Sequence, residues 1–385
     1  MKKPYSRGTI IPRKYMNFFV GHSKLDDVDA ALKEATSSFN NPDFLFYFSP
    51  LSKIKEVTEK IYNLFPNATC LGTSSHYVYS KSGLQRDVIS CFGFKDEIET
   101  SSDIILEIDR YPLKYADRVE NAIKKLSSPE NTICIELSTA FSMSEELLLT
   151  TLNSVCSKYN IPVAGGNAGI SPTELKNGVR KTYVGFKGKV YENACVFAML
   201  KKPKAPIRIY DEHFYKPTGI ELLITAIDIK NKTVLEINNM PAAEGLAKVL
   251  KCSIDEIPRK MNYYQFGKYV DGKLLISSFG RMFEDGSLEF NAHLFNQTKV
   301  MLLEPDDMKT IFKNTFNKIK VENPHANIGF LIHCQGRSMF LDEKNMLEDY
   351  AKDVGKLFPH FGGFSSLGEQ YKTLHLNHTM VMVVF

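Results

Sequence analysis

The sequence lacks tryptophan, lacks a long apolar run and lacks a strong excess of either charge. Because no run reaches about 18 apolar residues, we expect no membrane-spanning helix. Pro12, Arg13 and Lys14 interrupt the apolar residues near the N-terminus, so no signal-peptide core forms. Lys and Arg number 48 against 44 Asp and Glu, and no basic patch carries interleaved aromatic residues. We therefore expect neither nucleic acid nor a membrane as a partner.

Cysteine is present without the spacing of a metal site or a disulfide framework. The seven cysteines lie at positions 70, 91, 134, 156, 195, 252 and 334, so no CxxC pair occurs. Several lie inside apolar runs such as NTICIEL and ENACVFAML. This distribution is typical of reduced, buried thiols, and it predicts a cytoplasmic protein.

The common enzyme motifs are also missing. The sequence has no GxGxxG, no GxxxxGK followed by Ser or Thr, no GxSxG and no HExxH. His375 and His378 have no nearby cysteine or carboxylate that completes a familiar set of metal ligands. We expect no cofactor and no metal.

The composition is that of an ordinary globular protein. Apolar residues make up 43% and charged residues 24% of the 385 positions. A domain commonly takes roughly 100 to 200 residues, so this length predicts two domains with large cores.

One structural unit recurs three times along the chain, in residues 43–94, 131–200 and 327–385. Each copy reads as a strand, a helix with apolar residues at helical spacing, a proline stop, a short strand and an apolar antiparallel return. The returns follow turns too short for a parallel crossover. These patterns predict an α/β fold of mixed sheets flanked by helices, with two domains and internally repeated strand-helix-strand-hairpin units.

Small polar residues follow glycine at an equivalent point in each unit. We expect turns there, with binding groups held on loops by rigid elements. The segments are GTSS, GGNA and GGFSSLGE, and their candidate ligand-binding residues are Gly72, Thr73, Ser74, Gly166, Asn167, Gly363, Ser365, Ser366 and Gly368.

The chain resembles the FIST family, an N-terminal FIST domain followed by a C-terminal companion. The resemblance rests on FFVGHSKLDDVDAALKEA at 18–35, CLGTSSHYVY at 70–79, AGGNAG at 164–169, CQGR at 334–337 and GGFSSLGE at 362–369, with LNHT from Leu376 supplying Asn377. The lysine- and proline-rich stretch KKPKAPIRIY reads as the junction between domains. We therefore place the N-terminal domain at 16–202 and the C-terminal domain at 203–385.

The resemblance implies a cytosolic sensory module that binds small ligands such as amino acids and acts on a signalling partner. The chain departs from the commoner family pattern at FSSLG, where an aromatic residue is more usual before Gly368. The identity of the ligand is therefore open, and so is that of the signalling partner.

Ligand chemistry can also be read from the residues themselves. Arg337 can bind a carboxylate through two parallel hydrogen bonds, and Glu369 can accept from an ammonium group. We expect both to face one small-molecule cleft. The alternative is an Arg337–Glu369 ion pair that only ties two segments together.

Two other functions stay open at this point. A cysteine-dependent enzyme would use Cys334, with a histidine brought near by the fold, although a buried inert thiol is also consistent with its apolar surroundings. A protein-binding scaffold would have no cavity where the glycine segments meet.

Overall fold

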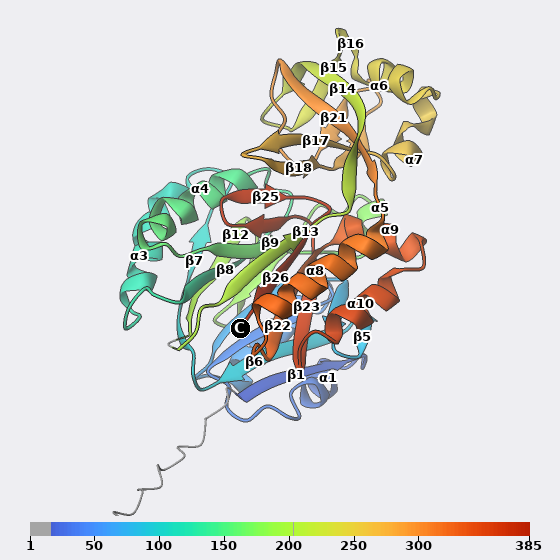
Figure 1. The fold of residues 1–385 in the computed structure, drawn as a ribbon. Helices are drawn as coiled ribbons and strands as arrows, with labels where there is room; N and C mark the ends of the chain where they lie inside the picture. The colour runs from blue at the N-terminus through green and yellow to red at the C-terminus, as the bar shows by residue number, and fades with distance from the viewer. Residues whose placement is uncertain (1–16, 203) are drawn as a thin grey trace, which may run out of the picture.

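The computed structural model describes residues 17–202 and 204–385, and it forms mixed sheets flanked by helices, as predicted. Three six-stranded sheets build the core, and a further sheet builds a small domain, residues 215–305, on top of it (Figure 1). The first sheet contains, in spatial order, β1 (Asn17–Ser23), β6 (Ile89–Lys95), β2 (Phe44–Ser49), β3 (Thr69–Ser74), β10 (Val184–Phe186) and β11 (Lys189–Tyr191).

The second and third sheets repeat this arrangement. The second contains β7 (Glu99–Leu106), β12 (Ala194–Lys201), β8 (Thr132–Ser138), β9 (Val163–Asn167), β24 (Glu369–Tyr371) and β25 (Leu374–Leu376). The third contains β13 (Arg208–Glu212), β26 (Met380–Val384), β22 (Ile328–Cys334), β23 (His360–Ser366), β4 (Tyr77–Ser80) and β5 (Gly83–Arg86). The predicted threefold repeat is confirmed, since each sheet has one parallel pair, an antiparallel return on one side and a hairpin on the other.

The hairpins are exchanged between units. The hairpin β4–β5 follows β3 in the chain, yet it pairs with β23 of the third sheet. The hairpin β10–β11 pairs with β3, and β24–β25 pairs with β9. Each unit therefore donates its hairpin to a neighbour, and the three sheets close into one cyclic assembly.

The inner faces of the three sheets share one apolar core. Phe46, Phe330 and Phe364 meet there, with the Phe46 and Phe330 rings stacked at 4.8 Å between centroids. Because both faces of these sheets are covered, strands such as FLFYFS are buried at every position.

Helices cover the outer faces, as expected. The core helices are α1 (Val28–Ala35), α2 (Ile54–Leu64), α3 (Ala116–Lys124), α4 (Glu145–Cys156), α5 (Pro172–Lys176), α8 (Met308–Glu322), α9 (Gln335–Glu343) and α10 (Leu347–Gly355), with short 3₁₀ turns η1 (Pro112–Tyr115) and η2 (Ser157–Tyr159). The first pair packs on the first sheet, α3 and α4 on the second, and α8 to α10 on the third (Figure 1). Within the described residues, no helix has the length and apolar character needed to cross a bilayer.

The small domain is inserted between β13 and α8. Its strands are β14 (Tyr215–Asp228), β15 (Thr233–Ile237), β16 (Met240–Pro241), β17 (Gln265–Val270), β18 (Lys273–Ser277), β19 (Phe279–Met282), β20 (Leu288–Phe290) and β21 (Thr298–Pro305), and its helical segments are α6 (Ala242–Leu250), η3 (Ile254–Glu256) and α7 (Ile257–Met261). It has its own apolar core around Phe266 and Phe290. The long strands β14 and β21 pair with each other and carry the chain into and out of this domain.

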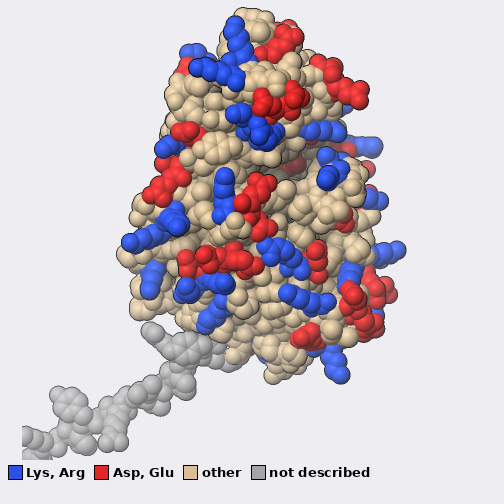
Figure 2. Space-filling model, turned by 90° about the vertical axis from the view of Figure 1, so that its right-hand side faces the viewer, with Lys and Arg blue, Asp and Glu red and all other residues tan. Residues whose placement is uncertain are grey.

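Charges of both signs are interspersed over the face of the molecule shown in Figure 2. Lys and Arg side chains alternate there with Asp and Glu, in keeping with the near-balance of the composition. That face therefore has no extended surface of one sign.

Candidate functional site between the core and the small domain

The three glycine segments meet at the centre of the core. The Ser75 and Ser365 hydroxyls lie 3.2 Å apart, and the Gly169 N–H donates to the Ser74 carbonyl at 2.8 Å. The Asn167 N–H donates to the Gly368 carbonyl at 2.9 Å. The structure thus brings the ends of β3, β9 and β23 together, although their positions are far apart in the sequence.

This junction is close-packed, and our prediction that the glycines form turns there is wrong. Gly72, Gly166 and Gly363 lie within β3, β9 and β23. A Cβ at Gly72 would lie 2.0 Å from the Tyr47 ring, and one at Gly363 would lie 2.3 Å from the Leu331 carbonyl oxygen. These glycines allow strands and side chains to approach, so no left-handed turn conformation is needed.

The polar residues of the junction mostly satisfy one another. The Asn167 Nδ2 donates to the Thr139 carbonyl at 3.1 Å, and its Oδ1 accepts from Gln370 at 3.2 Å. The Thr73 hydroxyl donates to the Tyr183 carbonyl at 3.2 Å. Their contacts tie units to one another.

Glu369 and Arg337, which we expected to face one cleft, are both fully buried and have different partners. Glu369 accepts from the Ser366 hydroxyl and, at 3.4 Å, from the Thr379 N–H. Burial raises the pKa of Glu369 well above its usual value. Burial therefore disfavours the charged form of this carboxyl group.

Arg337 forms its ion pair with Glu212 of β13, so the predicted alternative of an Arg337–Glu369 ion pair is wrong. The guanidinium also donates to the Tyr350 hydroxyl at 3.3 Å and lies over the Phe214 ring at 5.2 Å. Sequence reasoning missed Glu212 because it is 125 positions away and belongs to the edge strand next to β26.

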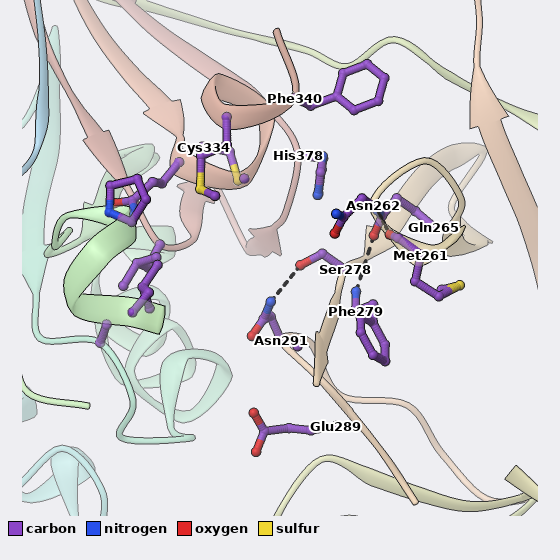
Figure 3. Close-up of a pocket in the computed structure, with 18 of the residues that line it drawn as sticks. Met261, Asn262, Gln265, Ser278, Phe279, Glu289, Asn291, Cys334, Phe340 and His378 are labelled. Carbon is purple, nitrogen blue, oxygen red and sulfur yellow. Dashed lines mark hydrogen bonds between the residues drawn. The ribbon is translucent and has the colours of Figure 1, made fainter. Parts of the chain in front are cut away.

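A cavity of about 440 Å³ lies beside the junction, between the core and the small domain (Figure 3). On the core side it is lined by the loop after β8 and by α5, α9, Leu367 and His378. On the small-domain side its walls are Met261, Asn262, Gln265, Ser278, Phe279, Gly280, Glu289 and Asn291. Cys334 is the member of our predicted set that lines this cavity.

The core wall around Cys334 carries neutral polar groups. Gln335 is fully buried, and neither its Oε1 nor its Nε2 has a hydrogen-bond partner among the described residues. Burial, and secondly the charge of Arg337, lower the pKa of His378 to about 3, so its imidazole is neutral at pH 7. Burial also raises the pKa of the Cys334 thiol. We call Cys334, Gln335 and His378 the inner wall.

The small-domain wall is held to the core by a hydrogen bond and is braced by two others within the small domain. The Ser278 N–H donates to Asn377 Oδ1 at 3.1 Å, so the predicted site residue Asn377 connects the two parts. The Asn291 Nδ2 donates to the Ser278 hydroxyl at 2.8 Å, and Gln265 Oε1 accepts from the Phe279 N–H at 3.2 Å.

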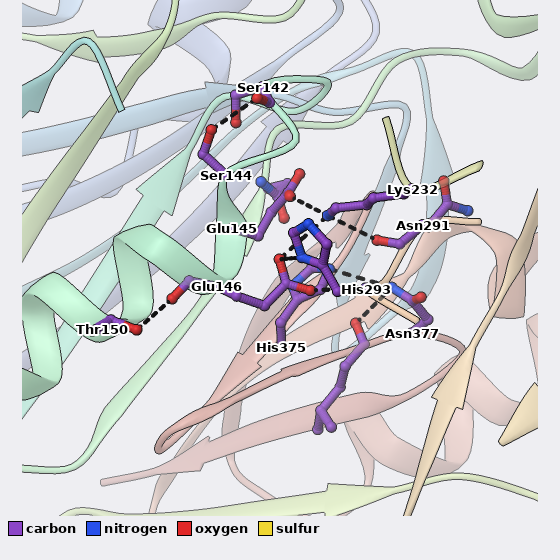
Figure 4. Close-up of polar contacts among 12 residues, drawn as sticks. Ser142, Ser144, Glu145, Glu146, Thr150, Lys232, Asn291, His293, His375 and Asn377 are labelled. Atoms are coloured by element: carbon purple, nitrogen blue, oxygen red, sulfur yellow. Dashed lines mark hydrogen bonds and ion pairs between the residues drawn. The ribbon is translucent and has the colours of Figure 1, made fainter. Parts of the chain in front are cut away.

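A buried ionic network also fixes this interface (Figure 4). Lys232, in the turn after β14, donates to Glu145 at 2.7 Å and to Glu146 at 3.3 Å, both in the first turn of α4. His293 Nδ1 lies 2.9 Å from Glu146. Burial opposes ionisation of Glu146, but the hydrogen bond with His293 and the charges of His375 and Lys232 outweigh it and lower the pKa.

Exposed charges lie on other walls of the cavity. Lys176 and Arg180 come from α5 and the residues after it, and Glu343 comes from the end of α9. None of the three has an ion-pair partner within the described part of the chain. Among those residues, no cluster of three or more histidine, cysteine or acidic side chains could hold a metal ion.

Sequence reasoning missed most of the cavity. The CQGR motif directed attention to Cys334 and Arg337, whereas the structure presents Cys334, Gln335 and Gly336 to the cavity and turns Arg337 away from it. The unusual placement of a glutamine directly after a buried strand was the available signal. The small-domain residues gave none, because their segments read as ordinary strands and helices.

Comparison with known families gives two matches that together cover most of the chain. The FIST N domain matches residues 43–240, and the FIST C domain matches residues 242–372. No curated protein matches the chain significantly.

Proposed function

The chain belongs to the FIST family, and on that premise we propose that it binds a small ligand in the interdomain cavity and signals to a partner protein. FIST domains are generally sensory, signal-transduction domains. The proposal adds the place of the ligand and the part of the molecule that responds to it.

The observation that carries this proposal is the unsatisfied Gln335 amide at a cavity of about 440 Å³. Ligand pockets commonly measure roughly 300 to 1,000 Å³ and place a few polar groups among apolar ones. A buried amide without partners costs about 1 to 3 kcal/mol for each group left unsatisfied. A ligand that bonded to Gln335 would remove this cost.

Amino acids or related metabolites suit the charges around the cavity. An amino acid has a carboxylate and an ammonium group, which need a cation and an anion. Arg180 and Lys176 supply the cations, and Glu343 supplies an anion. These residues take the roles we first gave to Arg337 and Glu369, which are both buried in the core, where Arg337 is paired with Glu212.

A signal would arise because the ligand touches both parts of the molecule. In this proposal a bound ligand changes the contacts between the small domain and the core, and a partner detects that change. The free cysteines, six of them buried, support a cytoplasmic location.

A cysteine-dependent reaction is less well supported. The nucleophile would be a thiolate, and burial raises the pKa of the Cys334 thiol, which opposes formation of the thiolate.

Thermal unfolding with a panel of amino acids and related metabolites tests the proposal. A ligand at 100 times its Kd adds about 2.7 kcal/mol to the free energy of unfolding. Leu175→Trp, which fills space on the α5 wall, should abolish the rise in Tm, whereas Leu113→Trp at an exposed position in η1 should leave it unchanged. Equal responses of both variants would contradict a site in this cavity.

A further inference from the structure

The Gln335 side chain offers an unused donor and an unused acceptor together. It begins α9, directly after Cys334, and the residue is fully buried. Its Oε1 lies next to Gly169, where an added Cβ would be only 2.9 Å away. The amide therefore occupies a fixed place between the start of α9 and the segment that leads into α5.

The other two residues of the inner wall carry no net charge. Cys334 is a neutral thiol and His378 a neutral imidazole, whose Nδ1 lies 3.4 Å from the Tyr215 hydroxyl. Arg337 follows Gln335 by two positions in α9, and its guanidinium is turned towards Glu212. The three residues of the inner wall themselves thus offer no cation to a ligand carboxylate.

A glutamine with both amide atoms free matches one chemical pattern best. A primary carboxamide also has one acceptor and an adjacent donor, so the two amides can form a pair of parallel hydrogen bonds. A carboxylate has acceptors only, so its second oxygen would face the Gln335 Oε1 lone pairs and the pair could not form.

We infer that the inner wall recognises a primary carboxamide on the ligand through paired hydrogen bonds with Gln335, and that it discriminates against the corresponding carboxylic acid. This inference rests on the proposed function and names the ligand class of the same site. The carboxamide can belong to an amino-acid side chain or to an aromatic ring, and the experiment separates these sources.

Titration calorimetry with the full-length protein compares three pairs of compounds that differ only in amide against acid. The pairs are L-glutamine with L-glutamate, L-asparagine with L-aspartate, and nicotinamide with nicotinate. At least one amide should bind roughly tenfold or more tightly than its acid, because a site built for paired hydrogen bonds rejects an analogue that leaves them unpaired. The pair in which the amide binds more tightly shows whether the carboxamide belongs to an amino-acid side chain or to an aromatic ring.

Variants at position 335 test the role of this side chain. Gln335→Met keeps the length and apolar stem but removes both hydrogen bonds, so the amide and the acid should bind within about twofold of each other. Gln335→Glu removes the donor and should weaken amide binding as well. Gln370→Met is the matched control, because Gln370 is equally buried but bonds to Asn167 outside the cavity.

Several outcomes overturn the inference. Equal binding of amide and acid by the unaltered protein does so without any variant, and so does an amide preference that survives Gln335→Met in a folded protein. A failure of all three amides to bind also overturns it. In those cases the proposed function would still stand if a non-amide compound bound the unaltered protein but not Leu175→Trp. If Leu175→Trp weakened the binding of no compound, the proposed function would be contradicted as well.

Discussion

The Glu136 side chain lies fully buried in β8, with Oε2 accepting from the Cys195 thiol at 3.3 Å and Oε1 without a partner among the described residues. Burial raises the pKa of Glu136 to about 8. Its value in the unfolded chain is about 4.3. The folded protein therefore binds one more proton than the unfolded chain between these pH values.

Stability should fall as pH rises through this window. We expect the free energy of unfolding to drop by up to about 1.4 kcal/mol per pH unit between about pH 4.3 and 8 because of this one carboxyl group. Glu136→Gln removes the carboxyl group, so the free energy of unfolding of the variant should rise relative to that of the unaltered protein as pH rises. Urea denaturation at pH 5.5 and 7.5 measures the difference.

Glu59→Gln on the exposed face of α2 serves as the control for a lost glutamate. If Glu136→Gln and the unaltered protein have parallel stability curves over the window, the carboxyl group is not the source of a pH dependence.

Among the elements, β23 contains the two adjacent glycines that we expected to form a turn. It lies parallel to β22, with Gly363 opposite Leu331. The clash expected for a Cβ at Gly363 is with backbone, which moves less readily than the end of a side chain. Replacing Gly363 therefore disturbs the pairing of two central strands.

Gly363→Ala should destabilise the protein by on the order of 1 to 3 kcal/mol, the usual cost of overpacking. The midpoint of urea unfolding measures it. Gly280→Ala in the exposed strand β19 is the matched control, because the nearest atom to its Cβ would be the flexible end of Glu289 at 3.1 Å. Equal midpoints for the two variants would show that β22 and β23 can separate to admit a methyl group.

The elements were largely predictable from sequence, whereas their partners were not. Pro66, Pro162 and Pro359 mark helix ends, and uniformly apolar runs mark strands buried on both faces, so the three units could be recognised. A hairpin such as β4–β5 carries no local signal for the sheet it joins. The junction could be predicted because all three units share it, but the cavity could not, because half of its wall comes from the small domain.

In the whole molecule, the exchange of hairpins joins the two ends of the chain into one core. The division at residues 202 and 203 remains our proposal for the domain boundary. Residues 17–202 alone would lack β24, the partner of β9, and would leave β4 without β23. Unpaired strand edges in the middle of a sheet expose backbone groups and apolar faces.

A fragment of residues 17–202 should therefore show no sharp thermal transition in circular dichroism and should aggregate. Co-expression with residues 204–385 should recover a one-to-one complex that melts cooperatively. As a control, the full chain with a protease site inserted between Lys202 and Lys204 should stay assembled after cleavage. A monomeric first fragment with a cooperative melt would contradict this expectation.

The same exchange sets a schedule for synthesis. Ser75, beside the first hairpin, finds its partner in Ser365, 290 positions later. At 5 to 20 residues per second, a ribosome needs roughly 15 to 60 s to cover that distance. The hairpin β4–β5 is synthesised early and has no partner strand during this interval, because β23 of the third sheet is not yet made. The apolar strands β2, β3 and β6 are also outside the exit tunnel by then. Until its last sixty residues appear, a nascent chain of this design exposes apolar surface and unpaired strand edges, which favour aggregation.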